Sequence, residues 1–454
     1  MHEGDSSHGI GFGEATRVWV SVALNSFGGP IGQIAVMHRL LVEERQWFSE
    51  RRFLHSLNYC MLLPGPEAQQ LATYLGWTLH GTRGGLVAGV LFILPGFVAI
   101  LALSVLYAGF GDTAWVEAVF YGIKPAVIAI VAGALVRISS RALQNRLMYG
   151  VAAAAFVSIF FFDIPFPVII LVAGLLGHLG GRLNLRPFDL DTGQLVEGTG
   201  QAPARVSDAA PARPRIARTL KTAAIGLLLW LTPVAILILW TGRDSIWSQQ
   251  GLFFSNAAVV TFGGAYAVLA YIAQQAVEAY QWLLPGEMVD GLGMAETTPG
   301  PLIQVVQFVG FMGAYRADLG IDPMLAGVLG ALLTTWVTFV PCFLWIFLGA
   351  PYIERLRGNR PINAALSTIT AAVVGVMLNL AVWFALHVVF GTVDELRHGL
   401  GLRLYRPELA TFDIAAAVLA LAGLYAVFRL KWSVTRTLAA SALAGFTAHL
   451  LIVG

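Results

Sequence analysis

The stretch "GGLVAGVLFILPGFVAILALSVLYAGF", residues 84–110, contains no charged side chain. A helix of about 20 apolar residues crosses a hydrocarbon core of roughly 30 Å, so this stretch predicts a transmembrane helix. Similar stretches recur along the chain, for example "AAIGLLLWLTPVAILILW" at residues 223–240. Of the 454 residues, 57% are hydrophobic and 12% are charged, whereas soluble domains carry about 25% charged residues. The sequence therefore predicts an all-α polytopic membrane protein.

One stretch differs from the rest and reads as a flexible cytoplasmic linker. Residues 182–218, "RLNLRPFDLDTGQLVEGTGQAPARVSDAAPARPRIAR", are rich in Pro, Gly and charge and have no apolar period. We expect a first repeat at 1–181, this linker at 182–218, an extra transmembrane helix at 219–241 and a second repeat at 242–454.

The two halves resemble each other at a constant offset. "SFGGPIGQIAVMHRLLVEERQW" from Ser26 aligns without a gap with "TFGGAYAVLAYIAQQAVEAYQW" from Thr261, and the same offset places Pro64-Gly65-Pro66 on Pro299-Gly300-Pro301. Such duplication is common in transporter folds. We therefore expect two inverted-topology repeats of about six helical segments each, with broken or re-entrant helices, plus one extra linking helix.

Inversion follows from the order of the segments. After its broken segments each half continues with four plainer ones, at about 84–110, 114–137, 147–162 and 164–181, and at about 324–350, 361–391, 407–428 and 435–453. The unpaired helix at 219–241 then reverses the orientation of the second unit in the membrane relative to the first. Whether the broken segments cross or re-enter stays open, although re-entry would place Arg39, Arg45, Arg51 and Arg52 on the basic, cytoplasmic side.

The repeated breaks predict a binding site. Irregular backbone at membrane depth survives where it lines a cavity or binds something, Phe-Gly-Gly allows a close approach to the main chain, and Pro-Gly-Pro ends one helix and starts another. Four helix starts with free N–H groups would converge near the midplane and attract an anion. The alternative is that Gly-Gly and Pro-Gly-Pro serve only close packing and kinking.

Side chains near the breaks complete the candidate oxyanion site, because hydroxyls and amides donate hydrogen bonds without fixing a counter-charge. From the first half we include Asn25, Ser26, Gly28, Gly29, Gln33, Gly65, Glu67, Gln69, Gln70 and Lys124. From the second half we include Thr261, Gly263, Gly264, Tyr266, Thr297, Thr298, Gly300, Gln304 and Gln307.

Charges inside apolar segments are expensive and usually functional. Glu296 has no acidic counterpart across the repeat and is a candidate for proton coupling or gating. Glu67 is either a second such candidate or a helix cap. Lys124 either offsets the charge of a dianion or pairs with a buried carboxylate. Glu43, Glu278 and Asp290 are expected in structural roles, the first two in salt bridges and Asp290 as a cap.

The sequence gives no sign of an enzyme. It lacks a Walker A stretch, a nucleotide fingerprint following a strand, and a Cys/His cluster for a metal, so no cofactor or metal is expected. Cys60 and Cys342 lie in apolar segments and are expected to pack there. Nothing predicts nucleic-acid binding, and a homo-oligomer is left open.

Several of these motifs resemble signatures of the chromate ion transporter (CHR) family. They are "SFGGP" (26–30), "LLPGPEAQQLATYLG" (62–76), "GIKPAV" (122–127), "FGGAYAVLAYIAQQAVE" (262–278) and "GLGMAETTPGPLIQVVQFVGF" (291–311). The resemblance covers the chain from about residue 15 onward. It implies a multi-pass protein of the bacterial inner membrane, with two oppositely oriented domains, that exports chromate by a secondary mechanism tied to the proton gradient and confers resistance.

We therefore expect a chromate exporter driven by the membrane potential or the proton gradient, with a cytoplasmic N-terminus. Two alternatives remain: a transporter of sulfate or another oxyanion, including proton-coupled uptake, and an anion channel. Chromate and sulfate are tetrahedral dianions of similar size, so the family name alone does not decide between them.

Overall fold

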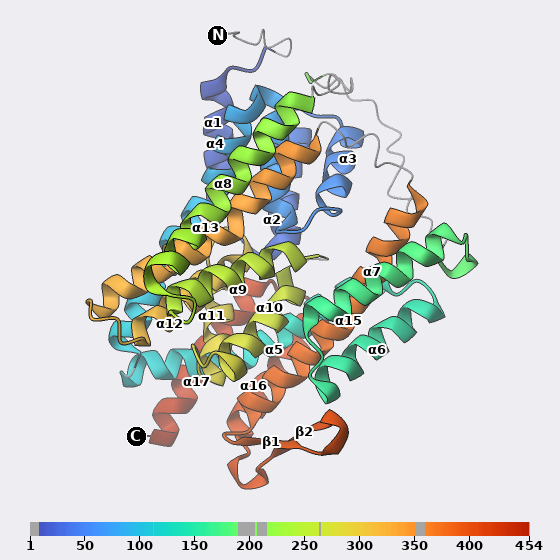
Figure 1. Cartoon of the computed structure of the whole chain (residues 1–454). Helices are drawn as coiled ribbons and strands as arrows, with labels where there is room; N and C mark the ends of the chain where they lie inside the picture. Colours follow the sequence, from blue (N-terminus) through green and yellow to red (C-terminus); the bar gives the residue numbers. More distant parts are fainter. Residues whose placement is uncertain are drawn as a thin grey trace. The chain divides into compact units, whose positions relative to one another are not determined.

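The computed structural model describes residues 9–111, 113–188, 205–206, 216–262, 265–350 and 359–453. Within these residues the chain is helical apart from one two-stranded sheet (Figure 1). Five helices of this described part are long and apolar enough to cross a membrane, spanning Glu67–Phe110, Ala114–Ala142, Ile216–Thr241, Pro323–Gly349 and Arg360–Val389. The all-helical, membrane-type prediction is confirmed to this extent.

The chain forms two compact units, and each unit takes segments from both halves of the sequence. The first unit comprises Met1–Leu101, Asp191–Ala265 and Thr298–Asn359, and the second comprises Ala102–Leu190, Tyr266–Thr297 and Arg360–Gly454. The sequence repeats are therefore not the same as the packing units. In the first unit, the first segments of the N-terminal half pack with segments of the C-terminal half.

The first unit contains the breaks. Its helices are α1 (Phe12–Leu24), α2 (Gly29–His38), the π-helical turn η1 (Arg39–Glu44), α3 (Glu50–Cys60), most of α4 (Glu67–Phe110), α8 (Ile216–Thr241), α9 (Ile246–Val260), η4 (Leu302–Gln304), α12 (Val305–Arg316) and α13 (Pro323–Gly349). Helix α13 packs against α8, α9 and α12. Helix α4 bends at His80 and Gly81, where the backbone leaves helical geometry.

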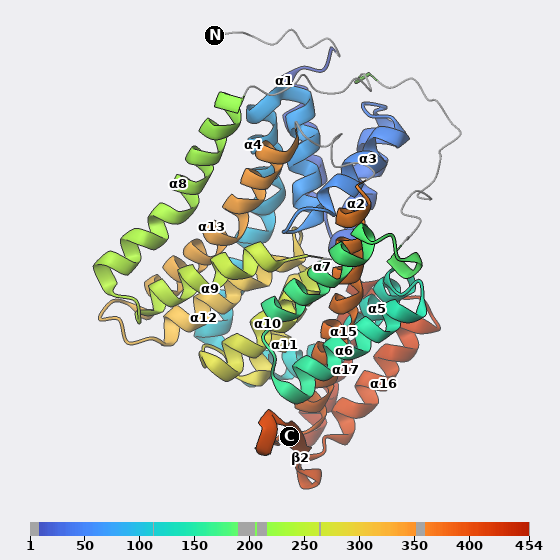
Figure 2. The same ribbon diagram turned by 45° about the vertical axis from the view of Figure 1, so that its right-hand side comes forward.

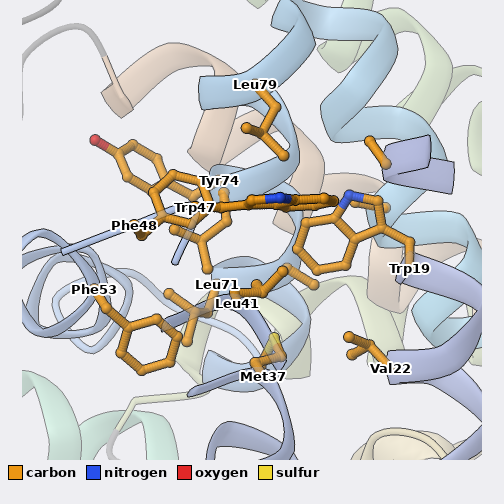
Figure 3. Packing of buried hydrophobic residues seen from close by; sticks show 14 of the residues in the cluster. Trp19, Val22, Met37, Leu41, Trp47, Phe48, Phe53, Leu71, Tyr74 and Leu79 are labelled. Atoms are coloured by element: carbon orange, nitrogen blue, oxygen red, sulfur yellow. The ribbon is translucent and has the colours of Figure 1, made fainter. Parts of the chain in front are cut away.

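A hydrophobic core of aromatic and aliphatic side chains holds α1, η1, α3 and the start of α4 together. Figure 3 shows Trp47 beside Trp19 in this core, with Leu41 and Leu71 below. Trp47 lies after the π-helical turn, and its amide donates to the carbonyl of Leu41 at 2.8 Å. The backbone amides of the linker residues Arg205 and Val206 donate to the carbonyls of Gln46 and Trp47, respectively. The rest of the linker from 189 to 215 lies outside the described residues, so its predicted flexibility stays a prediction.

The second unit contains the plainer segments of both halves. Its elements are α5 (Ala114–Ala142), α6 (Arg146–Phe162), α7 (Phe166–Arg182), η2 (Arg186–Phe188), α10 (Ala265–Gln274), η3 (Gln275–Ala279), α11 (Pro285–Thr297), α15 (Arg360–Val389), α16 (Ile414–Phe428) and α17 (Val434–Val453). Helix α15 runs beside α6 and α7, as Figures 1 and 2 both show, and α5 packs against α16 and α17.

The segment ends agree with the sequence predictions to within a few residues, with one exception. We expected a helix over 407–428, but α16 begins only at Ile414 because an antiparallel hairpin precedes it. Strands β1 (Val393–Arg397) and β2 (Arg403–Pro407) pair from Val393 opposite Pro407 to Arg397 opposite Arg403. The sheet departs from the all-α prediction. It has no counterpart in the first half, where only Leu143 to Asn145 join α5 to α6.

Residues that the 235-residue offset pairs also share backbone conformation. Gln46 and Gln281 are both non-glycine residues with positive φ, 52° and 53°, and each follows a π-helical turn, η1 or η3. Trp282 donates to the carbonyl of Ala276 just as Trp47 donates to Leu41. A sequence repeat confined to composition would not reproduce such rare conformations, so the resemblance of the two halves is structural.

Candidate functional site

The first break follows α1 within the first unit. Ser26 is buried and its hydroxyl donates back to the carbonyl of Val22 at 2.6 Å. Gly28 and Gly29 then adopt φ of +81° and +70°, and α2 starts with Gly28 as its N-cap. No side chain of the described residues caps this helix start. The two glycines of Phe-Gly-Gly thus adopt the left-handed backbone that glycine enters without strain.

The matching break follows α9. Thr261 donates to the carbonyl of Ala257 at 2.6 Å, which is the same bond that Ser26 makes to Val22. Gly263 and Gly264 lie outside the described residues, so their predicted role is untested. Asn25 is exposed and donates to the carbonyl of Ser21 at 2.7 Å.

The two Pro-Gly-Pro motifs separate helices as predicted. Helix α3 ends at Cys60 and α4 begins at Glu67, while η4 begins at Leu302, directly after Pro301. Gly65 has φ +128° and Gly300 has φ +100°, which only glycine adopts freely. A Cβ on Gly65 would lie 2.7 Å from Gln70 Nε2 and 2.9 Å from Cys342 Sγ, so the site also requires a small residue.

Main-chain hydrogen bonds cross between the breaks of opposite halves, all within the first unit. The Gly65 amide donates to the Thr261 carbonyl at 2.8 Å, and the Gly300 amide donates to the Ser26 carbonyl at 3.0 Å. Each Pro-Gly-Pro motif is therefore hydrogen-bonded to the residue that precedes Phe-Gly-Gly in the other half. The offset that relates Gly65 to Gly300 also relates Ser26 to Thr261, so the two bonds are equivalent.

Buried glutamines reinforce these crossings. Gln33 on α2 donates from Nε2 to the carbonyl of Gly300 at 2.5 Å, and Gln70 on α4 donates to the carbonyl of Pro64 at 2.7 Å. Both glutamines are buried. Three of the predicted site residues, Gln33, Ser26 and Gly300, thus meet in one place.

Helix α4 supplies a contact that the sequence analysis missed. Gln307 donates to the carbonyl of Phe97 at 2.9 Å. A Cβ on Gly96 would lie only 2.6 Å from the carbonyl oxygen of Pro299, so the "LPGF" of residues 94–97 packs against the second Pro-Gly-Pro. The signal was the Pro-Gly pair inside an otherwise apolar helix. Gly96 and Phe97 therefore join the site.

The remaining predicted residues of the first unit are Glu67, Gln69, Thr298 and Gln304. Glu67 is the first residue of α4 and is partly buried. Gln69, Thr298 and Gln304 are buried, with exposures of 0%, 9% and 1%. All four lie within three residues of a Pro-Gly-Pro motif.

Two predicted residues form a carboxylate–phenol pair in the second unit. The Tyr266 hydroxyl at the start of α10 donates to Oε1 of Glu296 near the end of α11. Glu296 is 2% exposed, and its Oε2 has no hydrogen-bond partner among the described residues. Thr297 next to it donates to the carbonyl of Met294 at 2.8 Å. A buried carboxyl group with one free oxygen is suited to gain and lose a proton.

Lys124 takes the second of the two roles that the sequence left open. Its Nζ lies 3.4 Å from Oδ2 of Asp290 on α11, and the Tyr107 hydroxyl donates to the same oxygen at 2.9 Å. Asp290 is 2% exposed and lies inside α11, so the prediction that it caps a helix is wrong. Its carboxylate instead forms an ion pair within the apolar part of the unit.

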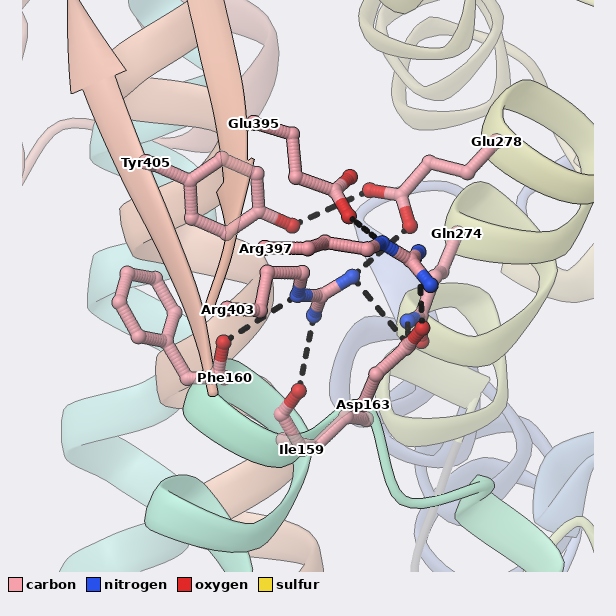
Figure 4. Close-up of polar contacts among 9 residues, drawn as sticks. All are labelled: Ile159, Phe160, Asp163, Gln274, Glu278, Glu395, Arg397, Arg403 and Tyr405. Carbon is pink, nitrogen blue, oxygen red and sulfur yellow. Dashed lines mark hydrogen bonds and ion pairs between the residues drawn. The ribbon is translucent and has the colours of Figure 1, made fainter. Parts of the chain in front are cut away.

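Glu43 and Glu278, the two carboxylates expected in salt bridges, both contact basic side chains. Glu43 accepts from His38 at 3.0 Å and is exposed. Glu278 meets Arg403 of β2 at 3.0 Å in the polar cluster of Figure 4. Arg403 is only 2% exposed and also bonds the carbonyls of Ile159 and Phe160. Its side chain therefore anchors the hairpin to α6 and η3.

Asp163 completes this cluster from the turn between α6 and α7. Arg403 Nη1 lies 3.2 Å from Asp163 Oδ1, and Gln274 donates to the same carboxylate. Burial and the neighbouring carboxylate of Glu278 raise the pKa of Tyr405, whose hydroxyl donates to Glu278 at 3.1 Å. A small cavity beside these residues is lined by Glu278, Arg403 and Tyr405, together with Asn379 and Trp383 of α15.

Cys60 and Cys342 are both buried, as expected for cysteines that serve packing. Among the described residues no group of three His, Cys, Asp or Glu side chains is arranged to hold a metal ion.

Comparison with known proteins identifies the family. A family profile described as "Chromate transporter" matches residues 13–178 and 248–446. The chain belongs to the chromate transporter family. Both matched segments contain one Phe-Gly-Gly and one Pro-Gly-Pro motif. With its long apolar helices, this chain is therefore a multi-pass membrane protein of a transporter family.

Three relatives illustrate the similarity. A chromate transport protein of Cupriavidus metallidurans is 30% identical over 350 residues, which cover 77% of this chain and 76% of the relative. One of Pseudomonas aeruginosa is 30% identical over 366 residues, 79% and 77% of the two chains. A probable chromate transport protein of Synechococcus elongatus is 28% identical over 363 residues, 80% and 81%. No solved structure matches this chain.

Proposed function

We propose that this chain is a secondary active transporter that exports chromate across the bacterial inner membrane and thereby confers chromate resistance. The observation that carries the proposal is the pair of crossed main-chain bonds, Gly65 to Thr261 and Gly300 to Ser26, in a member of the chromate transporter family. Relatives at 30% identity are named chromate transport proteins.

The chemistry of the breaks suits transient binding of an oxyanion. Helix starts present main-chain N–H groups and the positive end of the helix dipole. The hydroxyls of Ser26 and Thr261 already donate to main-chain carbonyls, so the donors left for an anion are main-chain N–H groups and the second amide hydrogen of Gln33, none of which carries a permanent charge. An anion held in this way can leave again, because no fixed cation retains it.

The membrane potential favours export of an anion. Each negative charge that leaves a cell gains about 2.3 kcal/mol per 100 mV of inside-negative potential. Proton antiport would add to this driving force. Glu296 with its free Oε2, and Glu67 at the start of α4, are the carboxyl groups that we assign to proton coupling or gating.

The two repeats are inverted in this proposal, and they alternate access to the site between them. The equivalent bonds of Gly65 and Gly300 and the matched conformations of Gln46 and Gln281 support two related repeats, and α8 is the unpaired helix that turns the second one over. Labelling of single cysteines tests this orientation. A Gly11→Cys variant is expected to react from the cytoplasm and an Asp244→Cys variant from outside, whereas the buried Cys60 and Cys342 give little background. Labelling of both from one side would rule out inversion.

Everted membrane vesicles test the transport activity. Energised vesicles that contain the protein are expected to accumulate chromate, and vesicles without it are not. Absence of accumulation by correctly inserted protein would refute export of chromate. Accumulation of sulfate instead would assign the chain to another oxyanion, and single-channel currents above carrier rates would identify a channel.

A further inference from the structure

Four helices of the second unit have an arginine at one of their ends. Arg141 lies in the last turn of α5 and Arg146 is the first residue of α6, while Arg182 ends α7 and Arg360 begins α15. All four side chains are exposed. They form one basic surface because these helix ends lie together.

Contacts between the helices place the four ends on one side of the unit. Residues 143–145 alone join α5 to α6, so the end of one helix meets the start of the other. Asn145 donates from Nδ2 to the carbonyl of Pro187, just past the end of α7, at 2.8 Å. A Cβ on Gly181 of α7 would lie 3.0 Å from the carbonyl oxygen of Arg360. The four arginines therefore lie around one area of the surface.

Helix α16 ends on the same side because it runs parallel to α5. A Cβ on Gly423 would lie 3.2 Å from the Cβ of Ala129, and one on Gly133 would lie 3.0 Å from Cγ1 of Val427. Residue numbers thus increase in the same direction along both helices. The turn from α16 to α17 therefore lies toward the end of α5.

This turn and the start of α17 add three exposed basic residues, Arg429, Lys431 and Arg436. The guanidinium of Arg436 lies over the ring of Trp432, 4.4 Å from its centroid. We call these three side chains and the four arginines above the basic end. In the described part of the chain, none of the seven forms an ion pair with a carboxylate.

The opposite ends of the same helices are acidic. Glu117 lies in the first turn of α5, Asp163 follows α6 and Asp413 is the N-cap of α16. The hairpin at this end pairs each of its arginines with a carboxylate. The charge of the second unit is therefore unevenly distributed along its helices, and the basic end holds cations that no described carboxylate neutralises.

The two halves of the chain place their basic residues at opposite ends of equivalent helices. In the first half these residues lie at the end of α5, the start of α6 and the end of α7, whereas in the second half they lie at the start of α15, the end of α16 and the start of α17. The inversion proposed above requires such a reversal if one face is to collect all seven. Basic loops face the cytoplasm in membrane proteins, so the basic end is assigned to that side.

Anionic phospholipids match this surface in charge, depth and geometry. The cytoplasmic leaflet carries a negative potential that attracts each Lys or Arg near it. Arginine presents a planar fork of donors that binds two phosphate oxygens at once. Trp432 and Tyr149, which is 60% exposed near the start of α6, are of the residue types that lie at headgroup level. Clustered cations repel one another, and phosphate groups offset that repulsion.

We propose that the basic end of the second unit binds the headgroups of anionic phospholipids in the cytoplasmic leaflet, and that this contact stabilises the protein against unfolding. The choice of leaflet rests on the orientation given under the proposed function, whereas the contact itself does not depend on the ion that is carried. The test measures unfolding and not transport, so failure of this inference and failure of chromate export are separate results.

Thermal unfolding in lipid nanodiscs tests the inference on the wild-type protein. Phosphatidylglycerol added to phosphatidylcholine discs is expected to raise the unfolding temperature by several degrees. The rise should shrink at about 1 M salt, where the Debye length falls to about 3 Å. Soluble glycerol phosphate, at the same phosphate concentration in phosphatidylcholine discs, is expected to have no effect. Equal unfolding temperatures in the two kinds of disc, or an equal rise with glycerol phosphate, would overturn the inference.

Removal of the charges locates the contact. The combination of Arg141→Gln, Arg146→Gln, Arg182→Gln and Arg360→Gln removes four of the seven cations. The rise caused by phosphatidylglycerol should then fall by about half or more. Each protein is compared with itself in the two kinds of disc, so a general loss of stability cancels. A full rise in this variant contradicts the inference.

The hairpin provides a control with an equal loss of charge. Arg397→Gln with Arg406→Gln removes two exposed arginines from the acidic end, and Arg141→Gln with Arg146→Gln removes two from the basic end. We expect the effect of phosphatidylglycerol to weaken in the second pair and to persist in the first. Equal weakening in both pairs would show that net charge alone attracts the lipid, and the assigned surface would be wrong.

Discussion

The amide of Gly65 donates to the carbonyl oxygen of Thr261 at 2.8 Å, and the equivalent amide of Gly300 donates to Ser26 at 3.0 Å. These bonds join four chain segments that are far apart in sequence but equivalent in pairs. A backbone interruption in a membrane must satisfy its own polar groups. Each half satisfies part of this requirement for the other, so neither break is expected to be stable alone.

This dependence predicts the effect of adding a methyl group at Gly65 or Gly300. Alanine at either position meets a φ that costs about 1–3 kcal/mol, and its Cβ would lie 2.7 Å from Gln70 Nε2 or 3.1 Å from the Gly96 Cα. We expect Gly65→Ala and Gly300→Ala to lower the melting temperature of the purified protein and to abolish transport.

Gly28→Ala is the control for this prediction. Gly28 also has a positive φ, +81°, but a Cβ there would meet no atom within 4 Å. Its expected cost is the backbone strain alone, about 1–2 kcal/mol. Equal loss of stability in all three variants would show that the crowding at the Pro-Gly-Pro motifs has no consequence.

The helices and the breaks were predicted well from the sequence because residues that are close together in the chain determine both. Apolar length marks α5, α7 and α13 to within a few residues, and Pro-Gly-Pro separates helices wherever it occurs. The crossing of the breaks was not predicted, because it depends on tertiary packing. Gly96 and Phe97 were missed for the same reason, since "LPGF" reads as part of an ordinary apolar helix.

The hairpin escaped prediction for a different reason. It lies between α15 and α16 and has no equivalent in the first half, so the repeat gave no information about it. Its strands, "VDELR" at 393–397 and "RLYRP" at 403–407, do not alternate strictly between charged and apolar residues. The period of two that is typical of a strand was therefore too weak to reveal the hairpin.

Arg403 is expected to be essential for the attachment of the hairpin. The buried guanidinium binds Asp163, Glu278 and two carbonyl groups, so its removal leaves two partly buried carboxylates without their buried cation and the carbonyls without a donor. Breaking a buried pair from one side costs about 3–5 kcal/mol. Arg403→Gln should therefore destabilise the protein strongly in thermal unfolding and expose the hairpin to protease.

Arg406 supplies the comparison for Arg403. It pairs with Asp394 at 3.0 Å on the same hairpin, but both side chains are exposed. Exposed pairs contribute about 0–1 kcal/mol, so Arg406→Gln should unfold at nearly the wild-type temperature. Similar unfolding of the two variants would show that the buried contacts of Arg403 contribute little.

The Lys124–Asp290 pair predicts a rescue. Lys124→Met leaves the buried carboxylate of Asp290 with only the Tyr107 hydroxyl among the described residues, at a cost of about 3–5 kcal/mol. Combining Lys124→Met with Asp290→Leu removes both charges, and we expect the double variant to regain most of the lost stability. Thermal unfolding of the two single variants and the double variant measures this. Additive losses in the double variant would show that the two charges do not stabilise each other.

Glu296 is expected to set the pH dependence of transport. Its carboxyl group is buried and accepts from the Tyr266 hydroxyl on one oxygen, while the other oxygen has no partner in the described part of the chain, so a proton can be gained or lost without breaking that bond. Glu296→Gln keeps an acceptor for Tyr266 but cannot titrate. Its initial rate in vesicles should fall by about tenfold or more, a loss of about 1.4 kcal/mol, and should vary less with pH than the wild-type rate.

Glu43→Gln is the control, because Glu43 is exposed and paired with His38. Protonation of the substrate affects both variants alike, so the difference between their pH profiles isolates the carboxyl group. Identical profiles would exclude Glu296 from proton coupling and leave Glu67 as the remaining candidate.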